Sequence, residues 1–210
     1  MNTTFSFLSA PSRLSPQANT HAGFDQVFAN GRLTFGLIAP LESYPHSPAP
    51  TMKDHLAMAQ LADQGGFSSL WLRDVPFYDP TFRDVGQVFD PMAYAGYLAC
   101  ATSRIALGTA GIVMPLRDPL AVAKQATTLD HLTDNRFILG LASGDRPVEY
   151  PVFGVDYATR SERFRDAVET IRAVTGPARM RGVLRASLPP PSRMTASELR
   201  ASRFAGETAQ

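Results

Sequence analysis

The chain has 210 residues, of which 44% are hydrophobic and 19% are charged, a composition typical of one ordinary soluble domain. The formal net charge of +1 argues against a partner held by a strong overall field, such as nucleic acid or an anionic membrane. A single cysteine, Cys100, excludes an intrachain disulfide and a multi-cysteine zinc site, and we expect no metal centre. No apolar run approaches the roughly 20 residues that span a bilayer, and residues 1–30 lack the pattern of a secretory signal. We therefore expect a cytoplasmic protein.

One pattern occurs four times along the chain: a short apolar run, a loop, and then an amphipathic segment. The runs predict buried strands over residues 33–39, 68–72, 104–109 and 136–141, and the segments predict helices over 52–64, 91–101, 119–132 and 160–174. Asp90-Pro91 and Asp118-Pro119 each place a capping residue before a proline at the first helical position. Strands that alternate with helices predict a parallel sheet with right-handed crossovers.

The predicted units define three parts of the chain. Residues 1–30 form an N-terminal extension, and four units of about 36 residues fill 31–174, half of the eight that complete a (β/α)8 TIM barrel. Residues 175–210 do not continue the pattern of alternating strands and helices, and they contain six Arg, two Glu and the run Pro189-Pro190-Pro191. We interpret this tail as disordered or frameshifted sequence. Arginine outnumbers lysine 18 to 2, and an out-of-frame stretch of GC-rich DNA encodes mainly Arg, Pro, Ala and Ser.

Candidate functional residues follow the predicted strands, because ligand sites of parallel α/β folds lie beyond the carboxyl ends of their strands. Small residues at Ala110-Gly111 and Ala142-Ser143-Gly144 would let a flat ligand approach the backbone. Two charged pairs, Arg73-Asp74 and Asp145-Arg146, would surround the same opening. The alternatives are structural: turn glycines at Gly111 and Gly144, and ion pairs between Arg73 and Asp145 or between Asp74 and Arg146.

Residues 103–140 (SRIALGTAGIVMPLRDPLAVAKQATTLDHLTDNRFILG) resemble the central signature of the bacterial luciferase-like monooxygenases. The shared features are a strand that ends LGT-A, a P-x-x-x-P start to the next helix, a helix that ends near LDxLT, and an RFxLG strand. The flanking strings GGFSSLWLRDVP and ASGDRPVEYPVFGVD agree and are similar to the luciferase-type oxidoreductase subgroup. The resemblance runs from about His21 to Val174.

This resemblance implies a flavin- or deazaflavin-dependent (β/α)8 barrel, truncated here to about its first four units. It places a cis peptide at Ala110–Gly111 against the flavin ring, and it places Ala142, Ser143 and Gly144 beside the ring as further cofactor-binding residues. Asp74 falls near the position of a catalytic histidine in luciferases, and we take Asp74 and Arg73 as the candidate catalytic residues. The implied reaction uses reduced FMN and O2 to oxygenate a small organic molecule, with a flavin reductase as partner.

Other functions are compatible with the same sequence. The enzymatic alternative is hydride transfer that uses the deazaflavin coenzyme F420 on the same scaffold. The non-catalytic alternatives are a binding half barrel that works by oligomerising and a fragment without function. Because the first and fourth strands of a half barrel would expose unpaired edges, we expect a homo-oligomer.

Overall fold

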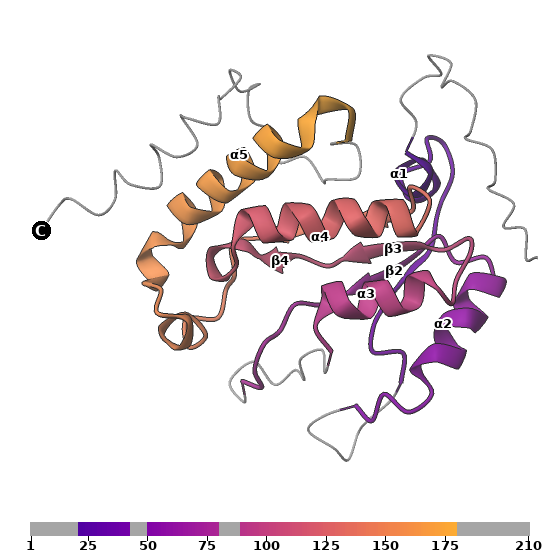
Figure 1. The fold of residues 1–210 in the computed structure, drawn as a ribbon. Helices are drawn as coiled ribbons and strands as arrows, with labels where there is room; N and C mark the ends of the chain where they lie inside the picture. The colour runs from indigo at the N-terminus through magenta and orange to yellow at the C-terminus, as the bar shows by residue number, and fades with distance from the viewer. Residues whose placement is uncertain (1–20, 43–49, 80–88, 180–210) are drawn as a thin grey trace, which may run out of the picture.

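The computed structural model describes residues 21–42, 50–79 and 89–179 (Figure 1). Its main sheet is parallel and follows the order of the chain, as expected for part of a (β/α)8 barrel wall. The four strands are β1 (Gly36–Ile38), β2 (Ser69–Leu72), β3 (Ala106–Thr109) and β5 (Phe137–Ile138). All four predicted strands are therefore confirmed, each shorter than the apolar run that contains it.

Two further short strands, β4 (Ile112–Val113) and β6 (Leu141–Ala142), prolong β3 and β5 beyond a break in each. Thr109 joins the two breaks: its Oγ1 donates to the Gly140 carbonyl and accepts from the Gly140 amide, both at 2.8 Å. The amide of Ile112 donates to the same carbonyl at 2.9 Å. A Cβ on Gly140 would lie 2.0 Å from the Thr109 carbonyl oxygen, so only glycine fits at this crossing.

The two faces of the sheet have different surroundings. The outer face belongs to the hydrophobic core beneath the helices and carries Leu70, Leu72, Leu107, Phe137 and Leu139, all buried. On the inner face, the single tryptophan, Trp71, lies in one row across the sheet with Ile38, Gly108 and Ile138, and its ring lies over Gly108 of the neighbouring strand. A Cβ at Gly108 would lie 2.5 Å from that ring, so the glycine gives the indole its space.

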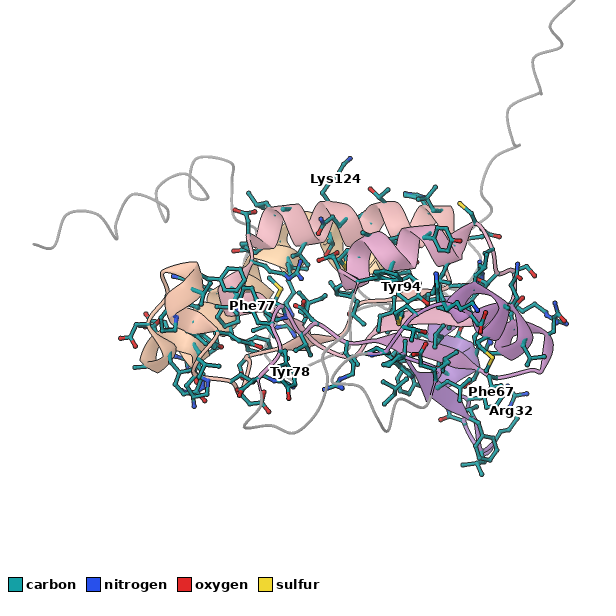
Figure 2. The ribbon with its side chains drawn as sticks, turned by 90° about the horizontal axis from the view of Figure 1, so that it is seen from below. Arg32, Phe67, Phe77, Tyr78, Tyr94 and Lys124 are labelled. Atoms are coloured by element: carbon teal, nitrogen blue, oxygen red, sulfur yellow. The ribbon has the colours of Figure 1, made fainter. Side chains whose placement is uncertain are left out.

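The outer helices are α2 (His55–Gln64), α3 (Pro91–Ala99), α4 (Pro119–Leu132) and α5 (Arg160–Arg179). Helix α4 packs between α3 and α5 and runs along the sheet (Figure 1). Figure 2 shows Lys124 pointing away from the sheet. None of the helices in the described ranges is both long enough and apolar enough to span a bilayer.

Both predicted aspartate caps are confirmed. Asp90 accepts from the amides of Met92 and Ala93 at 3.0 Å, and Asp118 accepts from the amides of Leu120 and Ala121 at 2.9 Å. In each case the proline that follows the cap is the first residue of the helix. These contacts satisfy amides that have no partner within the helix.

Helix α2 begins at His55, three residues later than predicted. The carboxylate of Glu42 accepts hydrogen bonds from the amides of Thr51 and Met52, and Met52 has a φ of 56°. The contacts with Glu42 hold Thr51 and Met52 in a turn, and an α-helix cannot run through a residue with the φ of Met52.

Residues 21–30, expected to precede the half barrel, form α1 (Ala22–Val27) against the amino ends of β3 and β5. The Gly23 amide donates to the Asn135 carbonyl at 2.9 Å, and His21 Nε2 lies 3.0 Å from Asp130 Oδ1. A Cβ on Gly23 would lie 2.8 Å from the Arg136 carbonyl oxygen, so a glycine allows this close approach.

At the other end, the helix that we expected to end at Val174 continues to Arg179. Thr175 lies within this helix, and its hydroxyl donates to the Ile171 carbonyl at 2.8 Å. The other residues of the predicted tail, 180–210, lie outside the described part of the chain.

Candidate functional site

A pocket of about 580 Å³ lies at the carboxyl end of the sheet. Figure 2 shows Phe77 and Tyr78, which follow β2, at the opposite end of the molecule from Arg32 and Phe67, which precede β1 and β2. The lining brings together every residue of the predicted site and its two predicted charged neighbours: Arg73, Asp74, Ala110, Gly111, Ala142, Ser143, Gly144, Asp145 and Arg146. The predicted convergence of the loops that follow the strands is therefore confirmed, and the remaining lining residues are Ile38, Val75, Val113 and Glu149.

Five small residues form what we call the floor of the pocket: Ala110, Gly111, Ala142, Ser143 and Gly144. Gly111 and Gly144 have φ angles of 108° and 75°, which favour glycine. A Cβ on Gly111 would lie 2.9 Å from that of Ala142, and one on Gly144 would lie 2.5 Å from the Tyr150 hydroxyl. The turn itself thus requires both glycines, whichever ligand the floor accepts.

The prediction of a cis peptide bond between Ala110 and Gly111 is wrong. Within the described residues the cis bond is Ala39–Pro40, an X-Pro bond, and the Ala110–Gly111 bond is trans. A cis bond before a residue other than proline costs about 3–4 kcal/mol. Here the positive φ of Gly111 makes the turn between β3 and β4 without that cost.

Asp74 is anchored by three hydrogen bonds. Its Oδ2 accepts from the Val113 amide at 2.9 Å and from Arg117 Nε at 3.0 Å, and its Oδ1 accepts from Arg117 Nη2 at 2.5 Å. The Asp74 side chain is only 4% exposed. The ion pair proposed with Arg146 is therefore replaced by one with Arg117, which the sequence analysis did not single out, although it directly precedes the Asp118 cap.

Arg117 joins the pocket to helix α3. Its Nη2 also lies 3.0 Å from Oδ2 of Asp90, the residue that caps α3. Burial lowers the pKa of Arg117, but the hydrogen bonds and charges of Asp74 and Asp90 outweigh burial and leave that pKa above its ordinary value. The guanidinium is therefore a fixed positive charge that holds the loops after β2 and β4 together.

Glu149 is a site residue that the sequence analysis missed. It is 2% exposed, it lines the pocket, and its Oε1 lies 3.9 Å from Arg146 Nε and has no hydrogen-bond partner among the described residues. Burial raises the pKa of Glu149 to about 7, Arg146 opposes the rise, and Asp74, Asp145 and Asp79 add to it. The charged groups that act on Glu149 come from the loop after β2 as well as from the loop that carries Glu149. The residues next to Glu149 in the sequence therefore could not predict its environment.

Tyr150 fixes the loop that carries the end of the floor. Its ring is fully buried and packs edge-on against Tyr157 at 4.9 Å, and its hydroxyl donates to the Ser143 carbonyl. Burial raises the pKa of this hydroxyl, and the nearby Tyr157 adds to the rise, so Tyr150 is a neutral donor at physiological pH.

The described residues contain no group of three or more His, Cys, Asp or Glu side chains placed to hold a metal ion. The pocket instead offers a small-residue floor with carboxylates and guanidinium groups around it. This arrangement suits a flat ligand that is held by backbone contact and by charges at its margin.

Comparison with known proteins gives a family match over most of the chain. The model of the luciferase-like monooxygenases matches residues 33–210, which extends beyond residue 174, where we expected the resemblance to end. Among curated relatives, the 4-hydroxyprotoasukamycin monooxygenase of Streptomyces nodosus subsp. asukaensis is 31% identical over 147 residues. That alignment covers 69% of this chain and 38% of the relative.

Solved structures give a matching result. The oxygenating constituent of 3,6-diketocamphane monooxygenase from Pseudomonas putida, solved in complex with FMN, has a TM-score of 0.58 at 17% identity and shares the fold. An F420-dependent secondary alcohol dehydrogenase has a TM-score of 0.53 at 27% identity. These alignments cover 68% and 66% of this chain but only 40% and 41% of the matched chains, so the chain spans less than half the length of the relatives described here.

Proposed function

The chain belongs to the luciferase-like monooxygenase family, and from this premise we propose that it is a flavin-dependent oxidoreductase that binds FMN in the pocket and oxygenates a small organic molecule. The observation that carries the proposal is the floor, where two glycines with positive φ and three other small residues meet from two loops. Bulky side chains at these positions would keep a planar ring away from the backbone.

The pocket fits such a cofactor. Its volume of about 580 Å³ lies within the range of roughly 300–1,000 Å³ of small-molecule sites. Arg73 and Arg146 line it and supply positive charge for an anionic group, while the floor supplies the flat face. When bound, a reduced flavin would supply, with O2, the oxygen-transfer chemistry.

The residues of this chain would position the cofactor and exclude water. Asp74 and Arg117 fix the Val113 amide, and thereby the strand that follows Ala110 and Gly111. Tyr150 fixes Ser143. We propose that Arg73 and Asp74, the predicted catalytic pair, act at the edge of this site, with Asp74 as a positioning residue because the Val113 amide and the Arg117 guanidinium hold both of its carboxylate oxygens.

A second candidate is hydride transfer with coenzyme F420. The structural likeness to an F420-dependent secondary alcohol dehydrogenase at 27% identity favours it. Both candidates use the floor and a small organic substrate, and they differ in the cofactor. For the flavin-dependent reaction we propose a flavin reductase as partner, and for either reaction we propose a homo-oligomer. Within the described residues β1 is an edge strand of the main sheet, and an unpaired edge can pair with a second copy of the chain.

Thermal unfolding with FMN, and separately with F420, tests the proposal. A ligand at about 100 times its dissociation constant stabilises a folded chain by about 2.7 kcal/mol, which raises the melting temperature by several degrees. Quenching of Trp71 fluorescence gives a second readout, because this chain has one tryptophan.

A matched pair of variants locates the site. Ala110 lies on the floor and is exposed, so Ala110→Leu fills the pocket without disturbing the core, whereas Ala57→Leu adds the same bulk to an exposed position of α2. We expect Ala110→Leu to lose the shift and Ala57→Leu to keep it. Absence of a shift in the native chain with either cofactor, or an unchanged shift in Ala110→Leu, would overturn the proposal.

A further inference from the structure

Glu149 is a buried carboxyl group that the positioning roles above do not use. It stands at the start of the 3-10 turn Tyr150–Phe153, is 2% exposed, and lines the same pocket as the floor. Its Oε1 has no hydrogen-bond donor within the described residues, and its nearest described cation, Arg146 Nε, is 3.9 Å away, beyond hydrogen-bond length. A carboxylate in such surroundings is poorly stabilised in its charged form, so this position favours a protonated carboxyl group.

The groups that face Glu149 come from two loops and are mainly acidic. Asp145 and Arg146 belong to its own loop, whereas Asp74 and Asp79 follow β2. The neighbouring Tyr150 hydroxyl is a neutral group that donates to Ser143. Burial raises the pKa of Glu149 to about 7, with Arg146 opposing the rise and the three aspartates adding to it.

The charge of the pocket depends on this one proton. The other charged lining residues are two arginines, Arg73 and Arg146, and two aspartates, Asp74 and Asp145, which cancel. The lining is therefore neutral with Glu149 protonated and carries one negative charge with Glu149 ionised. An anionic ligand that enters the pocket is repelled by the ionised form and favours the protonated one.

We propose that Glu149 is the proton-carrying group of the pocket: wherever its carboxylate is ionised, it takes up a proton from solvent when an anionic ligand binds and returns it to solvent when that ligand leaves. This inference rests on the proposed function for the identity of the ligand, FMN, whose phosphate supplies the negative charge. It assigns Glu149 a role in ligand binding that is separate from oxygen transfer.

The proton on Glu149 can be measured without ligand. The chain contains six glutamates, so carbon-13 labelling of glutamate side chains gives a short list of carboxyl resonances in NMR. We expect one resonance to titrate near pH 7 and to disappear in Glu149→Gln. In Glu162→Gln, an exposed position on α5, that resonance should persist. Titration of Glu149 near the ordinary value of about 4.3 would overturn the inference.

Calorimetry measures the proton that accompanies the ligand. FMN is titrated at pH 7 into the native chain in buffers of different ionisation enthalpy, with neutral riboflavin as the matched ligand. We expect FMN binding to take up as much as about half a proton, because about half of Glu149 is already protonated at that pH. Riboflavin binding, or FMN binding to Glu149→Gln, should lack this component.

The two proposals fail in different ways. FMN binding with no proton uptake, or with the same uptake in Glu149→Gln, overturns the role of Glu149 and leaves the proposed function intact. Absence of FMN binding by the native chain overturns the flavin function and this inference together. Loss of the proton component in Glu149→Gln, with FMN binding retained, supports both.

Discussion

The anchoring of Asp74 gives a prediction whose size follows from the structure. Asp74→Asn preserves the shape of a side chain that is 4% exposed and removes its charge. The amide oxygen of asparagine can still accept from Val113, but its NH2 group then points at Arg117, which is also a donor. We expect the substitution to destabilise the fold and to loosen the floor that Val113 adjoins.

The loss of stability expected for Asp74→Asn is smaller than the loss from breaking a fully buried ion pair. Removal of one partner of such a pair costs about 3–5 kcal/mol. Arg117 is 26% exposed and keeps Asp90 at 3.0 Å, so part of its charge stays compensated. We therefore expect Asp74→Asn to lower the free energy of unfolding by about 2–3 kcal/mol.

Urea unfolding at pH 7.5 measures this cost. Asp145→Asn is the matched control, because Asp145 lines the same pocket but is exposed, and its loss should change stability by less than about 0.5 kcal/mol. The double variant with Arg117→Gln should show a coupling energy above about 1 kcal/mol. A cost below about 0.5 kcal/mol for Asp74→Asn, or additive effects in the double variant, would refute the anchoring role.

Three further substitutions test other contacts. Glu149→Gln should flatten the pH dependence of stability, because the folded chain retains a proton that the unfolded chain releases between pH 4.5 and about 7, and the stability of the native chain falls across this window. In thermal melts, the stability gained by the variant over the native chain should grow by up to about 3 kcal/mol from pH 5 to pH 8, and an equal pH dependence of the two chains would contradict this prediction. Thr109→Val removes both hydrogen bonds to Gly140 and should cost about 2 kcal/mol in urea unfolding, with Thr109→Ser close to native. Gly144→Ala adds a Cβ 2.5 Å from the Tyr150 hydroxyl and should lower the free energy of unfolding by about 2–4 kcal/mol. Gly154→Ala has nothing within 4 Å and should lower it by only about 1 kcal/mol, because of its positive φ, and equal losses in the two variants would indicate that the contact with Tyr150 is unimportant.

The features that sequence predicted well are those set by neighbouring residues. Asp90 and Asp118 cap their helices because the capped amides are two and three residues away, a spacing that the chain fixes locally. The convergence of the loops after the strands was predictable for a related reason, since all strands of a parallel sheet end at the same edge.

The features that sequence missed depend on partners that are distant in the chain. Asp74 and Arg117 are 43 residues apart, and nothing local shows that Arg117 will outcompete Arg146 for that carboxylate. The late start of α2 depends on Glu42, nine residues before Thr51. The environment of Glu149 depends on Asp74 and Asp79, which follow β2 and lie at least 70 residues earlier in the chain.

Asp74 links the two parts of the site, because the charge that anchors Arg117 also acts on Glu149. Asp74 is one of the carboxylates that add to the burial effect and raise the pKa of Glu149. Asp74→Asn should therefore lower the pH at which the Glu149 resonance titrates, although Glu149 itself is not substituted. Asp130→Asn, which alters a carboxylate beside His21 at the opposite end of α4, should leave that pH unchanged. An unchanged or higher pH for Glu149 in Asp74→Asn would show that the charge of Asp74 does not act on Glu149, and would contradict the electrostatic connection between the two parts of the site.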